Sequence, residues 1–248
     1  MSQSTESTTE SNPFTKPGFI VAAALVVALA AAAIVIFLLP KGQSDARPIP
    51  DALESASASA SVSPDRADKS VCGLPSSSDT ALGKAPQSKW ELVGRMAAPT
   101  EPTTSGPGVA DASGFRSCFA HSPTGALYSA ANAVALGSSS QDEVKLAERL
   151  LVPGAGRDAA IQAATTRSSS PESSQSAQFK GFIMKSYSPT EADVDLAFQL
   201  HNGALAHSVL SLRWVDGDWK VKASDDGQIF TGTAQLNDLS GFIAWSGV

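Results

Sequence analysis

Residues 212–221 read LRWVDGDWKV, and this stretch decides how the C-terminal part of the chain folds. An Asp-Gly pair between two runs that alternate apolar and polar residues predicts a β-hairpin with a two-residue type I′ turn. This turn would place Trp214 opposite Trp219 and Leu212 opposite Val221. The apolar side chains of both strands would then lie on one face of a sheet.

The strand before this hairpin has the same period of two. Val194, Leu196, Phe198 and Leu200 alternate with polar or small residues, which is typical of a half-buried strand. A two-residue turn at Asn202-Gly203 would turn the next strand's apolar residues to the polar face. We therefore predict a three-residue loop over 202–204, which pairs Leu196 with Leu210 and Val194 with Leu212.

A mixed-charge row follows from this register on the opposite face of the sheet. Its members are Asp193, Asp195, Arg213, Lys220 and Lys222. Asp193 would lie beside Arg213, and Asp195 beside Ser211. The row is either a solvated sheet face, whose cross-strand pairs contribute a few tenths of a kcal/mol each, or a polar docking surface for another subunit.

Helices are predicted before the sheet. Ser122 is a plausible N-cap and Pro123 a plausible first residue for a helix that ends at Gly137. Further helices are predicted over 140–151 and 157–165. Residues 97–114 are rich in Pro, Thr and Gly, which indicates a loop. With a fourth strand over Phe179–Tyr187, the sequence predicts an α+β domain of two or three helices packed on a four-stranded antiparallel sheet.

The N-terminal part contains a separate hydrophobic signal. Phe19–Leu39 is an uninterrupted run of 21 uncharged, mostly apolar residues. As a helix it would cover about 31 Å, which is close to the hydrocarbon thickness of a bilayer. A cleaved signal peptide is the competing interpretation, but its apolar core is shorter. We predict a transmembrane helix that contacts the lipid bilayer, between disordered segments at 1–18 and 40–70 and ahead of a folded domain at 71–248.

The orientation of this helix rests on two signals that disagree. One Lys precedes the span closely and two cations follow it, which favours a cytoplasmic C-terminal part. Cys72 and Cys118, however, suit a disulfide in an oxidising compartment, although two buried thiols are an alternative. We predict a single-pass protein of the cell membrane, with the N-terminus cytoplasmic and the domain outside.

The hairpin and the helices ahead of it resemble the NTF2-like fold. Behind one N-terminal anchor, that fold is similar to VirB8-type and TcpC-type conjugation proteins and to Mce-associated membrane proteins. The segments 71–75 (VCGLP), 114–120 (GFRSCFA) and 123–126 (PTGA) further resemble an uncharacterised family of actinobacterial membrane-anchored proteins. The resemblance implies a scaffold function and supplies no catalytic residues.

Few residues could support enzyme chemistry. The chain has three histidines, His121, His201 and His207, and none of the HExxH, CxxC, GxSxG or phosphate-loop motifs. Cys118-x-x-His121 would supply only half of a zinc site. The net charge of -6 argues against direct nucleic-acid binding. We expect no catalytic residue, cofactor or metal.

Two functions then compete. The first is a non-enzymatic scaffold of the cell envelope that binds envelope proteins or itself, with a conjugative DNA-transfer apparatus as the system that the resemblance implies. The second is an extracytoplasmic domain that binds a small ligand beside Phe182, Phe198, Trp214 and Trp219, although a plain core needs the same side chains. An enzyme is the third alternative.

Overall fold

The computed structural model describes residues 69–139, 143–166 and 176–247. The predicted cytoplasmic tail, transmembrane helix and almost all of the linker lie outside these residues. Within the described ranges no helix is long and apolar enough to cross a membrane. These ranges contain ten strands and three helices.

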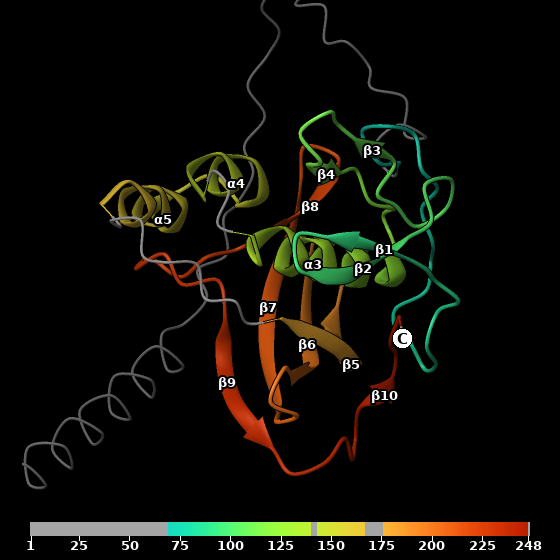
Figure 1. The fold of residues 1–248 in the computed structure, drawn as a ribbon. Coiled ribbons are helices and arrows are strands. Elements are labelled where there is room, and N and C mark those ends of the chain that lie inside the picture. The colour runs from blue at the N-terminus through green and yellow to red at the C-terminus, as the bar shows by residue number, and fades with distance from the viewer. Residues whose placement is uncertain (1–68, 140–142, 167–175, 248) are drawn as a thin grey trace, which may run out of the picture. The chain divides into compact units, whose positions relative to one another are not determined.

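The main sheet is antiparallel and has six strands (Figure 1). They are β5 (Ala177–Tyr187), β6 (Glu191–Leu200), β7 (Leu205–Val215), β8 (Asp218–Val221), β9 (Thr231–Leu236) and β10 (Ile243–Ala244). The order β10-β5-β6-β7-β8 follows hydrogen-bonded neighbours, and β9 also pairs with β7. One edge of β7 is therefore shared, because β8 pairs with its last residues and β9 with its first.

The predicted four-stranded, NTF2-like α+β domain is wrong. The main sheet has six strands, and two small sheets join it: β1 (Lys89–Val93) with β2 (Met96–Thr100), and β3 (Val109–Ala110) with β4 (Arg116–Ser117). The loop predicted over 97–114 therefore contains most of β2 and all of β3. β9 could not be recognised in the sequence because five of its six residues are exposed. Apolar and polar residues therefore do not alternate along it.

The three predicted helices are present. α3 (Pro123–Gly137) begins as expected, since the Ser122 hydroxyl accepts a hydrogen bond from the Gly125 N–H at 3.0 Å. α4 (Glu143–Leu150) and α5 (Ala155–Thr166) follow. α3 contacts β2, β5, β6, β7 and β8, so it lies against the apolar face of the main sheet. Its small side chains allow this close approach, and Ala126, Ala130 and Ala131 are fully buried.

The β7–β8 hairpin has the predicted register. Trp214 pairs with Trp219, and Leu212 with Val221. Asp216 and Gly217 have φ angles of 54° and 77°, as a type I′ turn requires.

The β6–β7 register differs from the prediction by two residues. The loop does contain three residues, but it is 201–203, because the Leu200 N–H donates to the Ala204 carbonyl at 2.9 Å. Val194 therefore pairs with Leu210 rather than with Leu212. A shift of two residues leaves each side chain on its expected face while changing its neighbours.

The end of the chain closes the core from the far edge of the sheet. Residues 237–242 lead from β9 to β10, which lie at opposite edges of the main sheet (Figure 1). Trp245 then enters the core, where its ring centroid lies 4.7 Å from that of Trp90 and 5.6 Å from that of Phe182. The chain thus reaches the core through two strands and the connection between them.

Candidate interaction face

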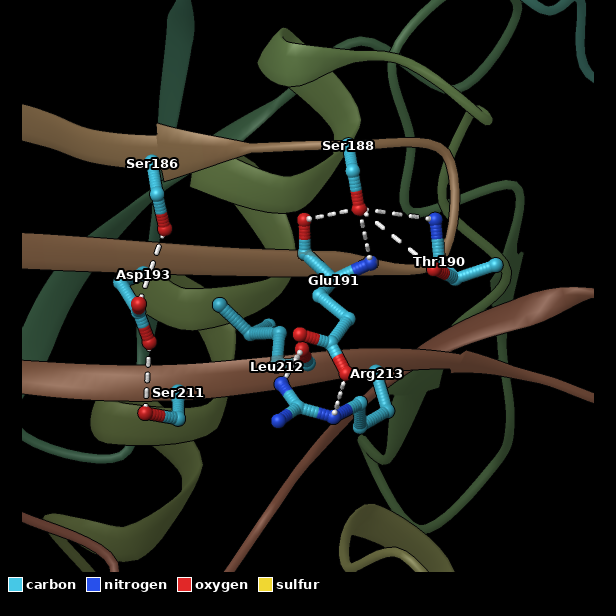
Figure 2. Close-up of polar contacts among 8 residues, drawn as sticks. All are labelled: Ser186, Ser188, Thr190, Glu191, Asp193, Ser211, Leu212 and Arg213. Carbon is cyan, nitrogen blue, oxygen red and sulfur yellow. Dashed lines mark hydrogen bonds and ion pairs between the residues drawn. The ribbon is translucent and has the colours of Figure 1, made fainter. Parts of the chain in front are cut away.

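The outer surface of β5, β6 and β7, away from α3, carries a row of ordered polar side chains. We call this the polar face and define it as Ser186, Glu191, Asp193, Ser211 and Arg213 (Figure 2). Ser186, Asp193 and Ser211 are cross-strand neighbours. The Asp193 carboxylate accepts hydrogen bonds from the Ser186 hydroxyl at 2.8 Å and from the Ser211 hydroxyl at 2.6 Å. Three strands thus hold one carboxylate in a fixed orientation.

The polar face also contains an ion pair. Arg213 pairs with Glu191, with 2.9 Å between Nε and Oε1, and its Nη1 donates to the Leu212 carbonyl at 2.9 Å (Figure 2). The Glu191 side chain is 57% exposed and that of Arg213 is 25% exposed. A pair with one well-solvated partner contributes at most about 1 kcal/mol to stability.

The turn before β6 fixes the position of Glu191. The Ser188 hydroxyl accepts hydrogen bonds from the Glu191 N–H at 3.1 Å and from the Thr190 N–H at 3.4 Å (Figure 2). Such a serine motif satisfies backbone donors that a tight turn would leave without partners. The Ser188 hydroxyl therefore holds the backbone of Glu191 in place at one end of the polar face.

The composition of the predicted row is only partly correct. Arg213 lies opposite Glu191 and not beside Asp193, because the β6–β7 register is shifted by two residues. Lys220 lies opposite Arg213, but its ammonium donates to the Arg149 carbonyl of α4 at 3.0 Å and so turns toward that helix. Lys222 is exposed just beyond β8.

Asp195 is buried instead of exposed. It lies opposite Val209 rather than Ser211, and the residue is only 3% exposed. His207 Nδ1 lies 2.9 and 3.1 Å from the two Asp195 carboxylate oxygens. The Phe242 ring packs edge-on against His207, with 6.0 Å between centroids. The segment between β9 and β10 therefore covers this part of the outer face.

The predicted pairing of Leu196 with Leu210 would place His207 opposite Gln199, and this register is wrong. His207 lies opposite Ala197, and Ala197 opposite Gly181. These small residues leave room for Phe242, whose Cβ would be only 3.1 Å from a Cβ at Gly181. A row of small residues on a sheet's outer face was the signal that a covering segment existed.

Cys72 and Cys118 form a disulfide, with a Cα–Cα distance of 6.1 Å. Asp218 lies beside it and is 9% exposed. Its carboxylate accepts hydrogen bonds from the backbone N–H groups of Cys118 at 2.7 Å and Phe119 at 2.8 Å. Burial raises the pKa of Asp218, and these hydrogen bonds oppose that shift without cancelling it. Cys118 and Phe119, the two residues after β4, are thus tied to the start of β8, and Cys118 is also bonded to Cys72.

His121 takes part in packing near the disulfide. Its ring stacks on that of Trp214 with 4.0 Å between centroids, and Nε2 lies 2.5 Å from the Pro189 carbonyl oxygen. The sulfur of Cys118 is bonded to that of Cys72, so Cys118 and His121 do not form half of a zinc site. The described residues contain no group of three or more His, Cys, Asp or Glu side chains that could hold a metal ion.

Comparison with known proteins identifies the family. A family model described as a domain of unknown function (DUF8175) matches residues 52–244. The chain belongs to this family. The DUF8175 match includes every described strand and helix, and it begins inside the predicted linker. No curated protein and no solved structure matches the chain.

The DUF8175 domain has a shallow apolar groove away from the polar face. Its volume is about 350 Å³, and α3, α4, α5 and the turn after β8 line it, with Leu146, Leu150, Ile229 and Phe230 among its residues. The aromatic residues that the sequence offered for a ligand site lie elsewhere. Phe182, Phe198 and Trp219 are core residues, and Trp214 packs against the core. A small-ligand function therefore stays a prediction, and the groove is where it would be sought.

Proposed function

We propose that this chain is a non-enzymatic, membrane-anchored assembly protein of the cell envelope, whose DUF8175 domain docks on another envelope protein through the polar face. The observation that carries the proposal is the Asp193 carboxylate, fixed by hydroxyls from two neighbouring strands, beside the Glu191–Arg213 pair. The predicted anchor at 19–39 supports a place at the membrane.

The arrangement suits recognition because its groups are already ordered. Each side chain held by an internal contact loses little further freedom when a partner binds. Both signs of charge occur within one small area, which orients a partner and rejects surfaces with the wrong pattern. The competing interpretation is a solvated sheet face, in which the same contacts serve only the fold.

The partner is defined by location and chemistry. It is an envelope protein with a complementary polar surface. A subunit of a conjugative transfer channel is one class of partner, and the sequence resemblance is its only support. That resemblance implied an NTF2-like fold, which the domain does not have. We therefore propose a role in envelope assembly and do not specify a conjugative channel.

The test is photo-cross-linking of the full chain in its native host. A photo-reactive amino acid replaces Ser186, at the edge of the polar face, or Thr103, an exposed residue of the β2–β3 connection. We expect covalent adducts to a defined envelope protein from position 186 and not from position 103. Equal adducts from both positions, or none from either, would contradict the proposal.

A charge swap separates docking from folding. The double variant Glu191→Arg with Arg213→Glu keeps an internal ion pair and reverses its polarity. We expect it to lose most of the adducts from position 186, while its urea midpoint changes little because the exposed pair contributes at most about 1 kcal/mol. Undiminished adducts would show that the Glu191–Arg213 pair takes no part in docking.

A further inference from the structure

β9 is an edge strand among the strands that the structure describes. It pairs with β7, and no other described strand pairs with it (Figure 1). Residues 231–235 are all exposed, although side chains along a strand alternate between the two faces. Toward the described part of the chain, the strand therefore presents unpaired backbone groups along one side and little packed surface on either face.

The other edges of the main sheet are covered, carry charge nearby or end in a strand of only two residues. Beyond β8, the Val152 N–H donates to the Val221 carbonyl at 2.9 Å and Leu151 bridges to Val221. Beyond β5, β10 pairs at Gly181 and Phe182, and β5 also carries Lys180 and Lys185. β9 has the sequence TGTAQL, without a charge or a proline. An edge without such protection is a template for pairing with another chain.

A bulge limits where such pairing can occur. Gly232 has a φ angle of 60°, and the β7–β9 register shifts between His207 and Val209. Bulges bend an edge and interrupt its ladder. The regular part of β9 that remains available is Ala234–Leu236, because Gly232 and Thr233 both lie within the shift.

We propose that Ala234–Leu236 pairs antiparallel with the same residues of a second copy, which makes one continuous sheet across two domains. This inference deepens the assembly function proposed above and rests on it, since it names one partner. In a two-fold pair each residue lies opposite itself or a near neighbour, so any charge in this stretch would face a like charge. The uncharged sequence meets that condition, and it offers no charge to a charged foreign strand.

The predicted anchor adds a concentration effect. Two copies held in one membrane share the same orientation and a small volume, so a short interface suffices where free domains would separate. Pairing over only three residues contributes little affinity on its own, so we expect more self-pairing in membranes than in dilute detergent.

The test uses single cysteines in the full chain in its membrane. Ala234→Cys and Gln235→Cys each add one thiol to the regular part of β9, beside the native Cys72–Cys118 disulfide, and Thr103→Cys is the control. Disulfides need a Cα–Cα distance of about 4.4–6.8 Å, so only positions close to their symmetry mates cross-link well. After mild oxidation we expect at least one β9 position to give about tenfold more reducible dimer than position 103.

A charge pair supplies the second readout. With Ala234→Cys as reporter in both copies, Gln235→Lys should lose the dimer, and mixing it with a Gln235→Glu copy should restore a mixed dimer. Dimer yields equal to the control, or β9 adducts to a different protein, would overturn self-pairing. Adducts from position 186 in the same membranes report separately on the polar face, so its failure and that of β9 are distinguishable.

Discussion

At the scale of single residues, the buried carboxyl of Asp218 beside the disulfide makes the stability of the domain depend on pH. Burial is the largest influence on this carboxyl, and it raises the pKa above the ordinary 3.8. The folded state therefore holds the proton to a higher pH than the unfolded chain does. Its contribution to the free energy of unfolding is greatest in acid and falls as the pH rises from about 3.8 through the raised pKa.

Asp218→Asn should remove this dependence, because an amide does not titrate. We expect the stability of the native protein, relative to the variant, to decrease as the pH rises above about 4. Urea titrations at several pH values measure it, and fluorescence is a suitable signal because all four tryptophans, Trp90, Trp214, Trp219 and Trp245, lie in the described domain. Asp225→Asn, at an exposed turn, is the control. Parallel pH curves for Asp218→Asn and the native protein would contradict the burial effect.

At the scale of elements, α3 offers a matched pair of glycines. A Cβ at Gly125 would lie 1.9 Å from the Ala120 carbonyl oxygen, whereas a Cβ at Gly137 meets nothing within 4 Å. Alanine favours a helix over glycine by about 1 kcal/mol at an interior position. Gly137→Ala should therefore be neutral or stabilising.

Gly125→Ala should instead destabilise the domain by about 3 kcal/mol or more, since a backbone oxygen cannot move as a flexible side chain does. The difference between the two urea midpoints measures the close approach of α3 to the preceding segment. Similar midpoints would mean that the start of α3 can shift at little cost.

Elements with a strong period or a clear cap could be predicted from sequence. The Ser122 cap, the three helices and the Asp216-Gly217 turn depend on local chemistry. β9 and β10 could not be predicted, because one is exposed on both faces and the other has only two residues. The β6–β7 register failed for a related reason: two registers that differ by two residues bury the same side chains. Because of that ambiguity, the predicted register placed Arg213 beside Asp193 instead of Glu191. It also did not bring Asp195 and His207 close together.

At the scale of the whole molecule, the Cys72–Cys118 bridge closes a loop with a sequence separation of 46. In the chain-entropy model a loop of this size stabilises the folded state by about 4 kcal/mol. The double variant Cys72→Ala with Cys118→Ala should lower the free energy of unfolding by roughly that amount. A urea titration with and without reductant checks it, because reductant should shift the native protein and leave the variant unchanged.

Alkylation followed by intact-mass measurement tests the bridge itself. The native chain should take up no alkyl group until it is reduced, and then two. Two groups on the unreduced chain would reject the bridge and with it the main argument for a domain outside the cytoplasm.

The bridge also sets how the domain responds to mechanical force. A pull from the N-terminal side, where the predicted anchor lies, enters the described domain near Cys72. It passes through the sulfur atoms to Cys118, which adjoins the hydrogen bonds of Asp218 and the start of α3. Residues 73–117, with the β1–β2 and β3–β4 hairpins, lie off that route. Tension between the membrane and an assembled partner would therefore not act on the two hairpins. It would act on the main sheet first at β8.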